Sequence, residues 1–494
     1  MNYITLFFTL LLPLNSIGVI LSEEVIFQEA RKNNSPSMLN LDLELEQAKL
    51  QASQTQEQFS AYFMAGANYI KTKERALISF SPVFSPVKQG YARYQKKFLK
   101  GFSLETGINL DKRSTLTQSG PTALRDASTV SPFIGVEIDL WKDFLGRVSG
   151  VDLINSQKQI EKSKLERKMN QTRFLITLRR VYWSLVANDL SMNISESLGK
   201  TNKRQLKMMR KRQKSGVADS GDVALFNSQV ISNEADIEEL RSGNLSLEHQ
   251  LRTLLPGFKN EKLKLGAYNP NKALLEILNC TAKVIKHEET PYEYTYQDEI
   301  LDLISKMNKN IMKKTNAYSD IDVKFKGRVS LKGIDTNTTG GSFSGAIDDF
   351  RDQGRESLEF GLEVKVPIGS QTRKSESILK RMNRLKVDAI VLSMKNQLEL
   401  THQSFVRNIG TLENLVTLSE KNTQTLKKRL KVMERKFSQA RISEADLIND
   451  QKSFLASNLG TIGLKLKILN TVFDYFEVFP DFPCGFNITK RSGQ

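Results

Sequence analysis

The sequence predicts a mainly α-helical protein built from two related copies, each of which also contains strands with one apolar and one charged face. Two long segments, 148–214 and 373–437, have helical periodicity and contain no proline. Alternating apolar and polar residues precede each of them, a pattern typical of half-buried strands. With 494 residues, of which 39% are hydrophobic and 26% charged, the chain has the composition of a folded protein.

The first 22 residues, MNYITLFFTLLLPLNSIGVILS, have the features of a secretory signal peptide: an apolar stretch, then small residues, then Glu23 and Glu24. Cleavage would fall after Gly18 or Ser22. An uncleaved anchor is the alternative, although Pro13 interrupts the apolar stretch. No later segment reaches the roughly 18 consecutive apolar residues that a transmembrane helix needs, so we expect strands to make any membrane crossing.

Strand-like alternation occurs twice before the second long helix and, more weakly, twice before the first. Segments 321–332 and 358–366 show it clearly, and segments 102–110 and 134–140 are the weaker versions. Four strands per chain cannot close a membrane barrel, for which about eight are needed. A barrel would therefore have to be shared between chains. An ordinary half-buried antiparallel sheet would explain the same alternation.

The two long helices carry the same heptad seam. Nine of twelve successive seam positions in the second helix are apolar, and subtracting 224 from each number gives a weaker seam in the first. Both seams pause at small or polar residues, at Ser195 and Gly199 in one copy and at Ser419 and Thr423 in the other. The common offset indicates an internal duplication. The seam of the second helix is Leu398, His402, Phe405, Ile409, Leu412, Val416, Ser419, Thr423, Leu426, Leu430, Met433 and Phe437.

The duplication divides the chain into consecutive parts. Shorter helices are expected at 38–60 and 293–317, before the strands of each copy. The predicted parts are a signal peptide at 1–22, a first repeat at 23–256 with a tip turn at 215–221 and a return helix at 222–255, a linker at 257–292, a second repeat at 293–479 with a tip turn at 438–443 and a return helix at 444–477, and a C-terminal tail at 480–494.

This order of parts resembles the TolC family of outer-membrane factors. The family's tip pattern, a helix end followed by Gly and then by an acid six residues later, appears as Gly216 to Asp222 and again as Phe437, Ala440 and Asp446, with Ala440 in place of the usual glycine. The phrase LWKDFLGR at 140–147 also looks like the family's start of the long helix.

The resemblance implies a fold and an assembly. The implied fold is mainly α with membrane strands: a homotrimer whose 12-stranded outer-membrane β-barrel, four strands from each chain, would continue as a long α-helical coiled-coil tunnel in the periplasm. The implied location is the outer membrane of a Gram-negative-type cell.

The function implied by the resemblance is that of an outer-membrane channel-tunnel. It would be the exit duct of a tripartite efflux pump or a type I secretion system, with outer-membrane lipid, a periplasmic adaptor (membrane fusion protein) and an inner-membrane pump or ABC transporter as partners. The alternative is a soluble basic coiled-coil scaffold or nucleic-acid-binding protein, suggested by the net charge of +17. That alternative explains neither the apolar N-terminus nor the strands, and we expect no nucleic-acid partner.

The resemblance also implies a selectivity site at the tunnel entrance. The family carries acids three residues apart in the second tip helix, and the matching positions are Asp446 and Asn449, with Asp450 next to them. Asp222 is the equivalent acid of the first copy. In a trimer one Asp becomes a ring that favours cations. The alternative is an acid that stabilises the positive end of a helix dipole.

Basic residues gather at the end of both long helices. The helix dipole favours cations only in the last turn, so the surplus predicts a docking surface for an acidic partner. This basic collar consists of Arg210, Lys211, Arg212, Lys214, Arg435 and Lys436.

Cys280 and Cys484 are the only cysteines, and in an exported protein they could form one disulfide; two free thiols are the alternative. No enzyme activity, cofactor or metal is expected. His249, His287 and His402 are scattered, and the sequence contains neither an HExxH pair nor a phosphate-binding loop.

Overall fold

The computed structural model describes most of the chain, in two compact units that we treat separately. One unit comprises 1–44, 164–300 and 392–494, and the other comprises 45–163 and 301–391. The described residues are 18–32, 35–72, 84–115, 126–286, 296–317, 320–336, 341–439 and 441–479.

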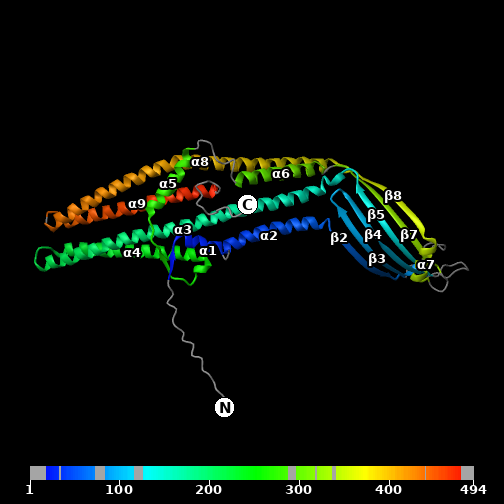
Figure 1. The fold of residues 1–494 in the computed structure, drawn as a ribbon, viewed down its shortest axis with the longest axis horizontal. Coiled ribbons are helices and arrows are strands. Elements are labelled where there is room, and N and C mark those ends of the chain that lie inside the picture. The colour runs from blue at the N-terminus through cyan, green and yellow to red at the C-terminus, as the bar shows by residue number, and fades with distance from the viewer. Residues whose placement is uncertain are drawn as a thin grey trace, which may run out of the picture. The chain divides into compact units, whose positions relative to one another are not determined.

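The predicted long helices are present as α3 (Ser149–Lys214) and α8 (Ser370–Ser438), which run for 66 and 69 residues without a break. Each is followed, after a short turn, by a 35-residue helix, α4 (Ser220–Leu254) or α9 (Glu444–Val478). Figure 1 shows the two pairs as antiparallel hairpins. The remaining helices are α1 (Glu23–Arg31), α2 (Pro36–Glu57), α5 (Pro270–Lys286), α6 (Tyr296–Asn316) and α7 (Phe343–Gln353).

The heptad seams are buried, as the periodicity predicts. In α8 the side chains of Leu398, Phe405 and Ile409 are at most 3% exposed. In α3 the matching Leu178 and Leu185 are equally buried and belong to the same core. The offset of 224 residues therefore relates positions that have the same packing role.

Within the described residues the sheet has six strands, in the order β2-β3-β4-β5-β7-β8, and every neighbouring pair is antiparallel (Figure 1). All four predicted strands are present, but the expected number of four per chain is too low. The strands are β2 (Ala61–Ile70), β3 (Phe84–Phe98), β4 (Phe102–Thr115), β5 (Asp126–Asp139), β7 (Asp322–Asp335) and β8 (Arg355–Lys365).

The two strands that the sequence analysis missed lack the expected signal for physical reasons. In β2, AYFMAGANYI, neither face is charged, so there is no apolar–polar alternation to detect. In β3, Pro86 lies near the start, and a proline normally argues against a strand because it cannot donate to the ladder.

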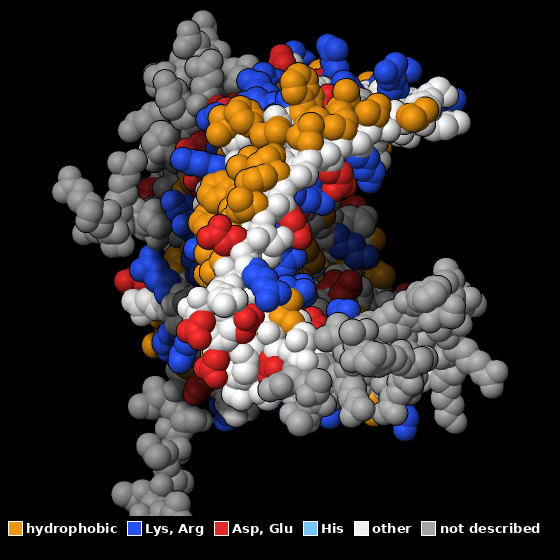
Figure 2. Space-filling model, turned by 90° about the vertical axis from the view of Figure 1, so that its right-hand side faces the viewer, with side chains coloured by type: hydrophobic (Ala, Val, Ile, Leu, Met, Phe, Trp, Pro, Cys, Tyr) orange, Lys and Arg blue, Asp and Glu red, His pale blue; other side chains and the backbone are white. Residues whose placement is uncertain are grey.

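One face of the sheet is apolar and exposed. The registers align Phe63, Tyr94, Thr106, Ile134, Val329 and Leu358 in a single row across all six strands. Phe63, Ile134 and Leu358 are 73%, 57% and 60% exposed. A band of hydrophobic side chains is visible in Figure 2, bordered by Lys, Arg, Asp and Glu. Exposed apolar area of this extent usually marks an interaction surface.

The opposite face is charged and internally paired. The Nζ atom of Lys324 lies 2.8 Å from a Glu137 oxygen, and Lys326 forms an ion pair with Glu363. Phe133, on this face, is 3% exposed because the guanidinium group of Arg328 lies 3.9 Å from its ring centre. The sheet thus has one apolar face and one charged face.

The helical unit contains a small sheet close to the N-terminal end. Strand β1 (Val19–Leu21) pairs in parallel with β6 (Leu263–Leu265), and Leu21 is 1% exposed. Ser22 accepts a hydrogen bond from the Val25 amide and caps α1. Of the predicted signal peptide, residues 1–17 lie outside the described residues. Cleavage after Gly18 would keep β1, whereas cleavage after Ser22 would remove it.

Candidate functional site

The two helix-turn-helix tips form the candidate site, and the first begins where α3 ends. The amide of Val217 donates to the Arg212 carbonyl at 2.9 Å and closes the last turn. Gly216 has φ +71°, a left-handed conformation that only glycine adopts without cost, and no atom lies within 4 Å of where a Cβ would be. The glycine is therefore required by the backbone conformation of the turn.

The start of α4 is fixed by a reciprocal pair of carboxylates. The Asp222 amide donates to Asp219 Oδ1 at 2.9 Å, and the Asp219 amide donates to Asp222 Oδ2 at 3.1 Å. This capping box satisfies two amides that the helix leaves without partners. Asp222 thus has a structural role, in agreement with the alternative reading of this residue as a helix-start acid.

The second tip repeats the first at the predicted offset. The Arg441 amide donates to the Lys436 carbonyl at 2.9 Å, as Val217 does to Arg212. Ser443 and Asp446 form the capping box of α9, with Ser443 Oγ 2.6 Å from Asp446 Oδ2. Ala440 lies outside the described residues.

An apolar core joins the two tips. Phe437 from α8 is 2% exposed, and its ring centre lies 5.9 Å from that of Phe226 on α4. The guanidinium group of Arg212 lies 5.1 Å from the Phe437 ring centre, an attractive cation–π contact. The core consists of Leu206, Met209, Phe226, Val230, Leu430, Phe437, Leu447 and Ile448.

The predicted entrance acids differ in exposure. Asp446 and Asn449 are exposed on the first turns of α9, whereas Asp450 is buried at 8% exposure. Arg429 Nε donates to Asp450 Oδ2 at 2.9 Å, so this carboxylate pairs with a cation of α8. Of the three, Asp446 offers a charged group to solvent, and its role at an entrance stays a prediction.

The residues of the predicted basic collar are exposed, apart from one. Five of its six residues are exposed, and Arg212 is half-buried against Phe437. Within the described residues, no ion pair joins any of the six to a carboxylate. Their positive charge is therefore available to a partner.

The pauses in the two seams are polar layers between helices. In the first repeat, Asn233 Nδ2 donates to the Ser195 carbonyl, and a Cβ at Gly199 would lie 2.4 Å from Asn233 Oδ1. In the second, the Oγ atoms of Thr423 and Ser457 lie 2.7 Å apart. The small residues of the seam thus make room for hydrogen bonds.

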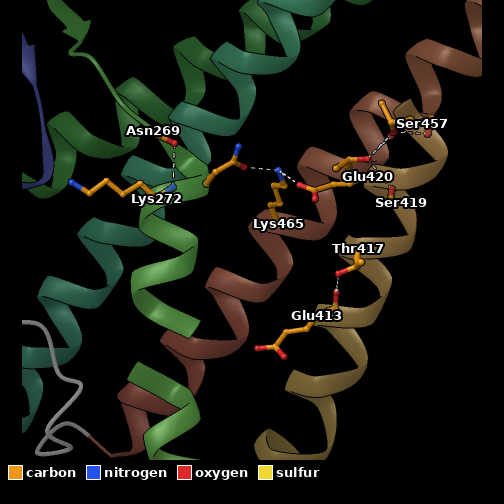
Figure 3. A network of polar contacts seen from close by, with 11 residues as sticks. Asn269, Lys272, Glu413, Thr417, Ser419, Glu420, Ser457 and Lys465 are labelled. Atoms are coloured by element: carbon orange, nitrogen blue, oxygen red, sulfur yellow. Dashed lines mark hydrogen bonds and ion pairs between the residues drawn. The ribbon is translucent and has the colours of Figure 1, made fainter. Parts of the chain in front are cut away.

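A second polar network ties α5 to the second repeat. Figure 3 shows Lys465 of α9 between α8 and α5. Its Nζ atom lies 2.5 Å from Glu420 Oε1 and donates to Asn271 Oδ1 at 2.6 Å. The predicted linker therefore contains a helix, α5, which packs against the hairpin formed by α8 and α9.

His402 and the two cysteines considered in the sequence analysis do not contribute to the tips within the described residues. His402 is buried in the seam, where its Nδ1 atom lies 3.0 Å from the Tyr475 hydroxyl, and burial lowers its pKa. The Cys280 side chain and all of Cys484 lie outside the described residues, so the disulfide stays a prediction. Among the described residues, no cluster of potential metal ligands occurs, and no helix is both long and apolar enough to cross a membrane.

Comparison with solved structures identifies the fold. The outer membrane protein VceC of Vibrio cholerae matches with a TM-score of 0.63 and 12% identity, over 94% of this chain and 97% of VceC. The CmeC outer membrane channel of Campylobacter jejuni matches with a TM-score of 0.63 and 10% identity, over 95% and 87% of the two chains.

The MtrE outer membrane channel of Neisseria gonorrhoeae, solved in its open state, matches with a TM-score of 0.59 and 13% identity, over 94% of this chain and 89% of MtrE. No family model matches the sequence, and no curated protein matches it. The chain therefore has the same fold as these outer membrane proteins over nearly its whole length, although its sheet has more strands than the resemblance implies.

Proposed function

We propose that this chain is a TolC-family outer-membrane factor and forms the exit duct of a tripartite efflux pump or a type I secretion system. It would conduct substrate passively from an inner-membrane transporter across the periplasm and the outer membrane. The proposal assigns no catalytic step to the protein. The solved structures that share its fold include outer membrane channels.

The observation that carries the proposal is the presence, in one chain, of duplicated helix-turn-helix tips and a sheet with an exposed apolar face. Soluble proteins rarely expose a row of large apolar side chains such as Phe63, Ile134 and Leu358. In a bilayer the same row would face lipid, while the charged face would line a water-filled interior. The soluble scaffold or nucleic-acid binder is thus the weaker candidate.

The assembly that we propose is a homotrimer. The heptad seams pair helices within the chain, and Leu392, Leu400 and Leu418 of α8 remain 62%, 64% and 62% exposed. Burying side chains of this size contributes about 1.5–3 kcal/mol each. Contact with a neighbouring copy would remove them from water, as expected for helices that form a closed tunnel wall.

The tips would face the inner-membrane partners. The collar offers unpaired positive charge around a rigid, capped turn, which suits an acidic surface of an adaptor or pump. Asp446, repeated in three copies, would place a ring of carboxylates at the entrance.

Cell fractionation combined with gel mobility tests the proposal against its alternative. We expect the protein in the outer-membrane fraction, migrating as a compact trimer before boiling and as a monomer after it. Recovery in the soluble fraction, with monomer migration in both samples, would support the scaffold instead.

A further inference from the structure

We propose that the two outer edges of the six-stranded sheet, β2 and β8, pair with each other between neighbouring copies, so that a trimer closes an 18-stranded wall. The family resemblance implies 12 strands, four from each chain. This inference rests on the proposed function, because it places the sheet in the membrane, but it concerns a property that the resemblance does not supply.

Both edges are long, regular and accessible. All 11 residues of β8 are exposed, as are nine of the ten residues of β2. The register of each strand with its inner neighbour runs without a shift, so no bulge twists either edge away. Within the described residues, neither strand has a partner on its outer side.

The β2 edge lacks the features that keep sheet edges apart. Monomeric proteins protect an edge with charged side chains, proline, bulges or a very short strand. Strand β2 contains no charged residue and no proline, and it is ten residues long. An edge of this kind is suited to permanent pairing with another strand.

The parity of the sheet allows the edges to join. Every neighbouring pair is antiparallel and the number of strands is even, so β2 and β8 run in opposite directions. Pairing β8 of one copy with β2 of the next is therefore antiparallel, like every other contact in the sheet. Such a head-to-tail contact uses two different surfaces, and it generates a closed ring when the rotation between copies closes, as in the proposed trimer.

The two faces of the sheet continue across this junction. Phe63 of β2 and Leu358 of β8 lie in the same apolar row, so joining the edges extends that row around the assembly. The charged residues Glu359 and Glu363 alternate with the apolar residues of β8 and would stay on the inner side. Every copy thus contributes one lipid-facing and one water-facing surface.

A 12-stranded wall would require β2 and β3 to leave the sheet. Strands β3 and β4 pair continuously from Phe98–Phe102 to Val87–Arg113. The rings of Phe98 and Phe102 stack with centres 4.3 Å apart, and Arg93 lies 3.6 Å from a Glu105 oxygen. Detaching β3 would break this ladder and leave its backbone groups without partners in a bilayer, which has no water to hydrogen-bond them.

The wider wall has a functional consequence. Barrel diameter grows roughly in proportion to strand number, so 18 strands give a diameter about 1.5 times that of 12. Barrels of about 16–18 strands leave an aqueous channel. The outer-membrane section would then pass larger or more hydrated substrates than a 12-stranded one.

Cysteine cross-linking in the intact cell envelope tests the junction. In a Cys280→Ser, Cys484→Ser background, Phe360→Cys on β8 is combined with Phe63→Cys, Ala65→Cys or Ala67→Cys on β2, all on the apolar face. The matched control combines Phe360→Cys with Ile108→Cys on the same face of β4, the strand that would be the edge of a 12-stranded wall. A bifunctional maleimide reports proximity without requiring one register.

We expect the β2–β8 pairs to give a ladder that ends at trimer, and the β4–β8 pair to remain monomeric on a denaturing gel. Cross-linking of β4 to β8, or a ladder that ends at dimer, would overturn the inference. Electron cryo-microscopy of the extracted wild-type assembly counts strands directly, and 12 strands would also overturn it. If the 18-stranded wall is overturned but the protein still fractionates with the outer membrane, the proposed function is unaffected. A protein recovered in the soluble fraction would contradict both the wall and the proposed function.

Discussion

Asp446 shows how one side chain can serve a turn and offer charge to solvent at the same time. Its carboxylate accepts from the Ser443 amide and hydroxyl, yet the residue remains exposed. Asp222 occupies the equivalent capping position in the first repeat but is half-buried. The duplication therefore provides a natural pair in which the cap is common and the exposure differs.

We expect Asp446→Asn to reduce cation selectivity several-fold, because in the proposed trimer it would neutralise a ring of three carboxylates while its amide oxygen can still accept the cap hydrogen bond. The measurement is the reversal potential of single channels in a salt gradient. Ser443→Ala is the control, since it removes the cap oxygen, at a cost of about 1 kcal/mol, and keeps the charge. Unchanged selectivity in Asp446→Asn would remove this residue from the entrance.

His402 is a titratable residue whose burial favours the neutral imidazole. It occupies the seam position that Leu178 occupies in the first repeat, and burial lowers its pKa below the ordinary value of 6.5. The unfolded chain therefore takes up a proton at a pH where the folded chain does not. Its contribution to stability is complete above about pH 6.5 and decreases as pH falls from there toward the folded pKa.

We expect the double variant His402→Leu, Tyr475→Phe to reduce the loss of thermal stability between pH 7.5 and 5.5. The second change is needed because Tyr475 is 1% exposed and its hydroxyl would lose the His402 ring as a partner. Over this pH range the wild type should lose more free energy of unfolding than the variant, by about 1 kcal/mol if burial lowers the pKa of His402 by about one. Melting curves of both proteins at several pH values measure it, and parallel pH dependence would contradict the role of His402.

At the scale of elements, the tips and the strands were predicted with unequal success. Long seams have strong local signals, and α3 and α8 run over the segments that the sequence predicted as long helices. The capping boxes at the tips are seen only in the structure. The apolar strand β2 has no alternation, and its partner β3 has a proline near its start, so neither could be detected from its own residues.

The collar gives a test of docking at the same scale. We expect charge reversal of Arg210, Lys211, Lys214, Arg435 and Lys436 to weaken binding of the periplasmic adaptor by at least about tenfold and to reduce its salt dependence. Arg212 is left unchanged because it packs on Phe437. Affinity of purified components at several salt concentrations is the measurement.

The control for the collar is charge reversal of Lys200 and Lys421, which are exposed on the same two long helices but farther from the tips. These changes should leave binding nearly as in the wild type. A loss of affinity per reversed charge that is the same in both variants would show that overall charge, not the collar, recognises the partner.

At the scale of the whole molecule, the duplication was predictable because an offset of 224 relates both the seams and the tip turns. The number of strands in the sheet was not, because it depends on pairing between β3 and β4. The solved structures that match at 10–13% identity share the fold across nearly the full chain. The fold is thus shared at a level of sequence identity that does not carry over the roles of individual residues.

The most direct test of the exit-duct proposal is the conductance of the purified, detergent-extracted wild-type protein in a planar lipid bilayer. The account predicts discrete single channels from a verified trimer, with a preference for cations. A folded trimer that inserts into the bilayer without conducting ions, or a protein that stays in the aqueous phase, would contradict the proposal that this chain forms a duct across the outer membrane.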